Sequence, residues 1–169
     1  MARRPRLTAD HLATAAILAM TGIALAHGYA AQLHYIEAAE HAAMGNMADE
    51  AASLTAIARA LVVSAVLGLA VAAWGVDVLW HRRATAAWTA VVLVGYGAMV
   101  AAGIASRTSV GLAGHTDDAG PLWAVTVAAE LAVMLAVAAY AASVRATSQG
   151  AAFGGAIVTD RLGVVSSPR

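Results

Sequence analysis

Three polar residues lie inside long apolar stretches of the sequence, where a charged side chain is costly. His27, Arg59 and Glu130 belong to three different stretches, several residues from the end of each. If the stretches are membrane helices, a rise of about 1.5 Å per residue places the three residues at a similar depth. A central charge costs about 2.5–3.5 kcal/mol on insertion scales, so each residue needs a partner or a purpose. We therefore predict an intramembrane polar cluster of His27, Arg59 and Glu130 with an Arg59–Glu130 ion pair.

This predicted cluster has three interpretations. The ion pair locks the helices together with His27 alongside, or the cluster belongs to a proton or ion path. In the third interpretation, Arg59 extends on its own to the outer membrane surface. Tyr96, in the middle of another apolar stretch, needs a hydrogen-bond acceptor such as a backbone carbonyl of a neighbouring helix.

A second group of polar residues has the spacing of metal ligands on a helix. His34, Glu37 and His41 are separated by three and four residues, and His27 comes seven residues before His34. These separations place the four residues on one face of a helix. Residues 34–44 contain no helix breaker, so we expect the first helix to continue outward to Gly45-Asn46. Histidine and carboxylate groups at such spacing bind zinc or copper, and the alternative is a solvated face with a His41–Glu37 pair. The candidate metal ligands are His34, Glu37, His41, His115 and Asp117.

The sequence gives little support for a haem site, for cysteine-based sites or for a known catalytic motif. A haem held by two histidines needs them at matching depth on neighbouring helices. His11 and His81 are such a pair, but both fall at the inner membrane boundary next to water and Arg, and a haem needs greater depth. The absence of Cys excludes disulfides, thiolate zinc sites and iron–sulfur clusters. The sequence has no phosphate-binding glycine loop and no nucleophile elbow. We expect the protein to have no catalytic activity of its own.

Four apolar runs must position these residues. The 169 residues are 61% hydrophobic and 12% charged, against about 45–50% and 25% in soluble domains. Each run is long enough to cross a hydrocarbon core of roughly 30 Å and lacks the alternation of barrel strands. We predict an all-α antiparallel bundle of four transmembrane helices in residues 1–146, with a flexible cytoplasmic tail at 147–169. The predicted helices are residues 12–33, 54–80, 88–106 and 122–144.

The distribution of Arg predicts the orientation of the bundle. All ten basic residues are Arg. The connection between the first and second predicted helices and the connection between the third and fourth lie on the same side of the membrane, and together they contain a single Arg, Arg107. Because cytoplasmic segments carry the excess of basic residues, both termini are expected in the cytoplasm of a bacterial plasma membrane. Trp80 and Trp88 are expected at the inner interface, and Tyr35 and Trp123 near the outer one. The Arg residues on the cytoplasmic side are Arg3, Arg4, Arg6, Arg82, Arg83, Arg145, Arg161 and Arg169.

A cleaved signal peptide is the competing interpretation of the first run. Arg3–Arg6 supplies a basic region, and Ala24-Leu25-Ala26 has the pattern of a cleavage site. The apolar character continues through Leu33, past that site, which favours a retained helix.

These features indicate a small multi-pass membrane protein that contacts the lipid bilayer. Ten acidic and ten basic residues balance, so no basic surface for nucleic acid is present. Little mass outside the membrane favours an accessory or scaffold subunit of a larger complex, bound to other membrane subunits or to itself. The alternatives are an extracytoplasmic metal-binding or redox protein that uses the candidate metal ligands, and a small proton- or ion-coupled transporter that uses the intramembrane cluster.

The orientation can be tested with reporter fusions. Fusions at Arg82–Arg83 and at the C-terminus should report the cytoplasm, whereas fusions at Asp49 or Thr116 should report the outside, because of the Arg distribution. A C-terminal fusion that reports the outside would mean that the first run is cleaved or does not span the membrane.

Overall fold

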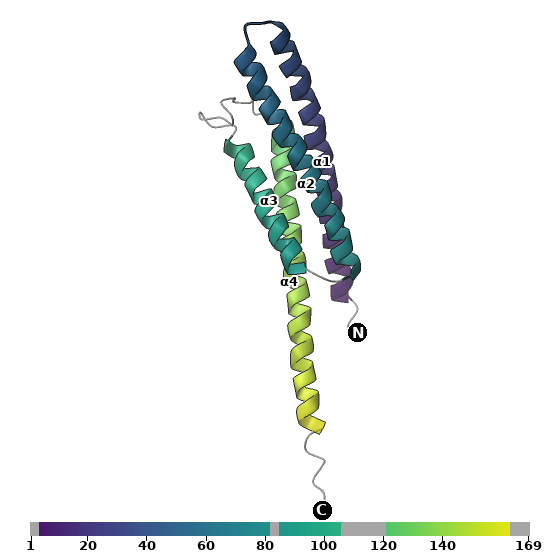
Figure 1. The fold of residues 1–169 in the computed structure, drawn as a ribbon. Coiled ribbons are helices and arrows are strands. Elements are labelled where there is room, and N and C mark those ends of the chain that lie inside the picture. The colour runs from purple at the N-terminus through teal and green to yellow at the C-terminus, as the bar shows by residue number, and fades with distance from the viewer. Residues whose placement is uncertain (1–3, 82–84, 106–120, 163–169) are drawn as a thin grey trace, which may run out of the picture.

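Four long helices dominate a computed structural model of the chain, which describes residues 4–81, 85–105 and 121–162 (Figure 1). All four are long and apolar enough to cross a membrane, and they pack together. This confirms the predicted all-α class and the four membrane helices, since each predicted run lies within one helix over its described residues. The helices are α1 (Arg4–Ala43), α2 (Ala48–His81), α3 (Thr85–Ala105) and α4 (Pro121–Leu162).

The first two helices form a hairpin that is longer than a membrane crossing. α1 has 40 residues and α2 has 34, whereas α3 has 21. At about 1.5 Å per residue, α3 alone matches the hydrocarbon core, and the α1–α2 hairpin extends beyond the end of α3 (Figure 1). Gly45 follows α1 with a φ of 74°, a left-handed conformation that favours glycine. The expected continuation of the first helix beyond residue 33 is therefore present.

α4 differs from the sequence-based expectation at its C-terminal end. We expected the last helix to end near Val144 and residues 147–169 to form a flexible tail, but α4 continues to Leu162. Its apolar, membrane-compatible part is Ala124–Gln149. The Ala-rich sequence after Val144 lacks proline until Pro168, and scattered glycines alone do not end a helix. Residues 163–169 lie outside the described part of the chain.

The helices pack unevenly against one another. α1 packs most extensively against α2 and also against α4, and α4 packs against α3. α2 and α3 share the smallest of these contacts. The bundle is thus a tight α1–α2 hairpin with α4 against α1 and α3 against α4 (Figure 1).

Small residues bring α1 and α2 close together. A Cβ atom placed on Gly68 would lie 3.2 Å from the Cβ of Ala24, and one on Gly75 would lie 3.0 Å from Cγ1 of Ile17. These contacts are seven residues apart on both helices, so they define one antiparallel register along the hairpin. Such close approach of backbones is typical of membrane helices, where packing replaces hydrophobic driving force.

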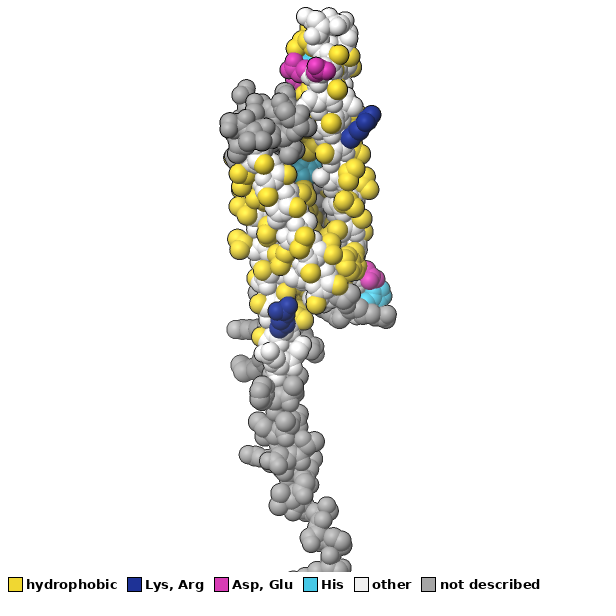
Figure 2. Space-filling view, turned by 60° about the vertical axis from the view of Figure 1, so that its left-hand side comes forward, with side chains coloured by type: hydrophobic (Ala, Val, Ile, Leu, Met, Phe, Trp, Pro, Cys, Tyr) yellow, Lys and Arg dark blue, Asp and Glu magenta, His cyan; other side chains and the backbone are white. Residues whose placement is uncertain are grey.

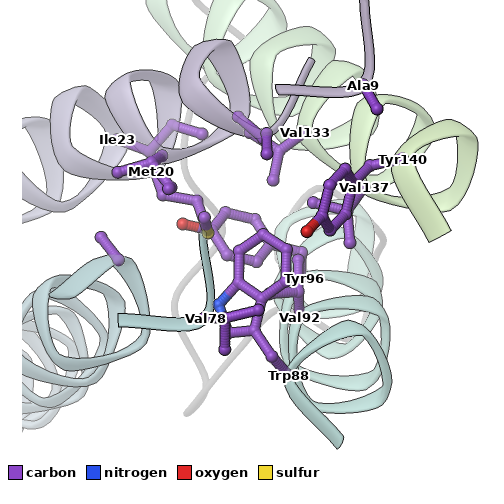
Figure 3. Close-up of a cluster of buried hydrophobic side chains, with 14 residues drawn as sticks. Ala9, Met20, Ile23, Val78, Trp88, Val92, Tyr96, Val133, Val137 and Tyr140 are labelled. Atoms are coloured by element: carbon purple, nitrogen blue, oxygen red, sulfur yellow. The ribbon is translucent and has the colours of Figure 1, made fainter. Parts of the chain in front are cut away.

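Trp88 is packed inside the bundle, which differs from the interfacial position that we expected. Its side chain is 1% exposed, whereas Trp80 is 81% exposed. The indole Nε1 donates to the backbone oxygen of Val71 at 3.0 Å, and the ring meets Tyr140 edge to face with centroids 6.2 Å apart (Figure 3). Burial is tolerated because this hydrogen bond satisfies the polar atom of the indole. The side chain of Trp123 lies outside the described part.

Gly75 provides the space that the Trp88 indole needs. A Cβ on Gly75 would lie 2.8 Å from Cζ2 of Trp88, and the hydrogen bond to Val71 opposes movement of the ring. We expect Gly75→Ala to lower the free energy of unfolding in detergent by about 1–3 kcal/mol through overpacking. Gly95→Ala is the matched control, since no described atom lies within 4 Å of that Cβ and alanine favours the helix. Equal effects of the two substitutions would contradict this packing.

Candidate functional site

A buried carboxylate and a histidine face each other between α1 and α4. Nε2 of His27 lies 3.7 Å from Oε1 of Glu130, and the two side chains are 13% and 4% exposed. Glu130 points inward because it continues the buried face of α4 that also carries Val133, Val137 and Tyr140 at helical spacing. An acidic residue thus occupies a position that helical periodicity assigns to the apolar core.

Tyr96 of α3 completes this layer, with Gly68 of α2 beside it. Tyr96 is buried, and its hydroxyl oxygen lies 3.9 Å from the position that a Cβ on Gly68 would occupy. Because Gly68 is level with Ala24, one helical turn from His27, Tyr96 lies near the level of the His27–Glu130 pair. We define the polar layer as His27, Tyr96 and Glu130, which come from three helices, while the fourth helix contributes the space at Gly68.

Some polar atoms of the polar layer make no hydrogen bond to the other side chains of the layer. The Tyr96 hydroxyl and Nδ1 of His27 are buried and have no hydrogen-bond partner among the described residues. The contact between His27 and Glu130 is longer than a direct hydrogen bond. Buried polar groups are normally satisfied, often by internal water.

Arg59 lies away from this layer. It is exposed on α2, and no ion pair joins it to an acidic residue in the part of the chain that the structure describes. By the α1–α2 register, Arg59 is level with Leu33, because each is nine residues from the Gly68–Ala24 contact. Six residues separate this level from His27, or about 9 Å. The expected Arg59–Glu130 pair is therefore not formed, and the exposure of Arg59 favours the interpretation in which it extends on its own.

The candidate metal ligands on the hairpin form separate pairs. Nδ1 of His34 lies 3.6 Å from Oε2 of Glu37, and Nδ1 of His41 lies 3.9 Å from Oε2 of Glu50 on α2. The His41–Glu37 pair, which was the alternative to a metal site, is replaced by this contact across the hairpin. Among the residues that the structure describes, no three metal-ligating side chains come together. The other two candidate ligands, His115 and Asp117, lie outside the described residues.

The remaining described histidines are at the opposite end of the hairpin. His11 is exposed, and Nδ1 of exposed His81 lies 2.7 Å from Oδ1 of Asp77. Neither position has the burial that haem ligation requires.

Two contacts of the described structure were not evident from the sequence. Glu50 comes shortly after the Gly45-Asn46 turn, and its contact with His41 depends on how α2 returns alongside α1. Spacing along a single helix does not reveal such a contact. The need of Tyr96 for a partner was predicted from its position in an apolar run, but the position of its hydroxyl beside Gly68 of α2 was not.

Comparisons with known protein families, with curated proteins and with solved structures found no match to this chain.

Burial should make the His27–Glu130 pair far more strongly coupled than a similar pair on the surface. In a double-mutant cycle of His27→Ala and Glu130→Gln, we expect a coupling of about 1–3 kcal/mol in the free energy of unfolding. The His34–Glu37 pair is the matched control, because its atoms are 3.6 Å apart but Glu37 is 50% exposed. Its coupling should stay below about 0.5 kcal/mol. Additive effects of His27→Ala and Glu130→Gln would show that the two side chains do not interact.

Proposed function

We propose that this four-span membrane protein binds and exchanges a proton at the His27–Glu130 pair, as part of a small proton-coupled device. The observation that carries this proposal is that the partner of the buried carboxylate is a histidine and not an arginine. An arginine keeps its charge and would fix Glu130 as a carboxylate. A histidine changes its charge within the physiological pH range, so the pair can take up or release a proton.

Charge balance in the membrane favours one bound proton on this pair. With neutral His27 and ionised Glu130 the pair carries a net negative charge, which is costly in a medium of low polarity. One proton, on either the imidazole or the carboxyl group, makes the pair neutral overall. The buried Tyr96 hydroxyl, which has no hydrogen-bond partner among the described residues, supplies a further donor near this level of the bundle.

An accessory or scaffold subunit is the second candidate, and it is compatible with a proton site. It is supported by large apolar side chains beyond the level of Arg59, at the projecting end of the hairpin. Tyr35, Ile36 and Met44 are all exposed there. Apolar groups exposed outside the hydrocarbon core favour contact with another protein. Orientation with this end of the hairpin outside the cytoplasm, in a bacterial plasma membrane, belongs to the same proposal.

Infrared spectroscopy tests whether Glu130 exchanges a proton. For the protein in lipid bilayers, lowering the pH should produce a carboxyl band from protonated Glu130, and Glu130→Gln should remove that band. Glu40→Gln is the matched control, because Glu40 is an exposed carboxylate outside the polar layer. A spectrum that Glu130→Gln leaves unchanged would overturn the proposal.

A further inference from the structure

Three histidines follow one line along α1, from the end of the hairpin to the polar layer. His41, His34 and His27 are separated by seven residues, which is close to two helical turns. Each is partly buried, and Nδ1 of each is buried without a hydrogen-bond partner among the described residues. A solvated helix face would expose these atoms. We call these three residues the histidine line.

The histidine line runs alongside small side chains of α2. The register set by Gly68 and Ala24 places Ala65 level with His27, Ala58 level with His34 and Ala51 level with His41. All three alanines are buried. The His41–Glu50 contact across the hairpin agrees with this register at its far end. Small residues therefore accompany the histidines over the whole distance.

An acidic group lies beside every member of the histidine line, and each comes from a different helix. The partners are Glu50 on α2, Glu37 on α1 and Glu130 on α4. α3 contributes Tyr96, whose hydroxyl lies beside Gly68 near the level of His27, and Arg59 of α2 is exposed near the level of His34. Histidine and carboxylate pairs of this kind accept and release protons readily.

In the proposed orientation, the histidine line crosses the outer boundary of the membrane. Arg59, whose side chain extends to the membrane surface in this interpretation, is level with Leu33. His34 therefore lies at the membrane boundary, His41 lies outside the membrane and His27 lies within it. Successive histidines are about 10 Å apart along the helix, so bridging groups are needed between them. Glu37 lies between His41 and His34 in the sequence of α1. Thr126, one turn before Glu130 on α4, lies between the levels of His34 and His27.

We propose that His41 and His34 form a proton-entry route from the outer surface to the His27–Glu130 pair. This inference rests on the proposed function, since it concerns how protons reach that pair. Protons move from Glu50 and His41 past Glu37 to His34, and from there past Thr126 to His27, with water completing the connections. His41 and His34 act as relay groups and not as the final proton acceptor.

The rate at which Glu130 becomes protonated tests this route. After a rapid drop in pH, the Glu130 carboxyl band of the protein in bilayers should appear at least about tenfold more slowly in His34→Ala than in the unchanged protein. The final amplitude of the band should stay the same, which shows that the variant is folded. Added imidazole should restore the rate, as expected for a missing proton carrier. His11→Ala, which changes an exposed histidine at the other end of the same helix, should leave the rate unchanged.

The outcomes separate this inference from the proposed function. Unchanged rates in both His34→Ala and His41→Ala, with a normal band, would overturn the route and leave the proton site in place. Absence of the Glu130 band in the unchanged protein would overturn the proposed function itself. A slow rate that imidazole does not restore would assign His34 a structural role and would also overturn the route.

Discussion

Close packing of α1 against α2 determines where the polar groups of the bundle lie. Gly68 and Gly75 allow α2 to approach Ala24 and Ile17, and this contact sets the register of the hairpin. The same glycines leave space for side chains from α3, the indole of Trp88 at Gly75 and the hydroxyl of Tyr96 near Gly68. The close approach of α1 and the positions of both α3 side chains therefore depend on the same two glycines of α2.

The membrane gives the buried carboxylate its chemical character. Glu130 shares the inward face of α4 with Val133 and Val137, where bulk water does not compete for it. Arg59 and Arg145 are both exposed, and basic side chains are visible near the two ends of the apolar surface in Figure 2. Among the described residues, the ionisable group that faces Glu130 is His27, which can itself gain or lose a proton.

Hydropathy predicted the four helices because lipid demands long apolar segments with internal hydrogen bonds. It did not predict the register. The depths of His27 and Arg59 were counted from the ends of their apolar runs, but those ends are at different levels of a hairpin that is longer than a membrane crossing. Trp88 was misplaced for a related reason, since an indole with a backbone partner can be buried. Contacts between helices decide such positions, and one sequence contains little information about them.

The seven-residue spacing of the histidine line can be followed along α1 beyond His27 toward the N-terminus, but the residues at those positions are apolar. The next positions are Met20 and Ala13, both buried in the apolar core with Trp88 and Tyr140 (Figure 3). Apolar packing of this kind excludes the water that proton transfer needs. In the proposed orientation, the route therefore leads inward from the outer side and ends at this apolar packing. Such one-sided access suits a site that loads a proton from outside and couples its charge to the helices around it, and it does not suit a continuous proton channel.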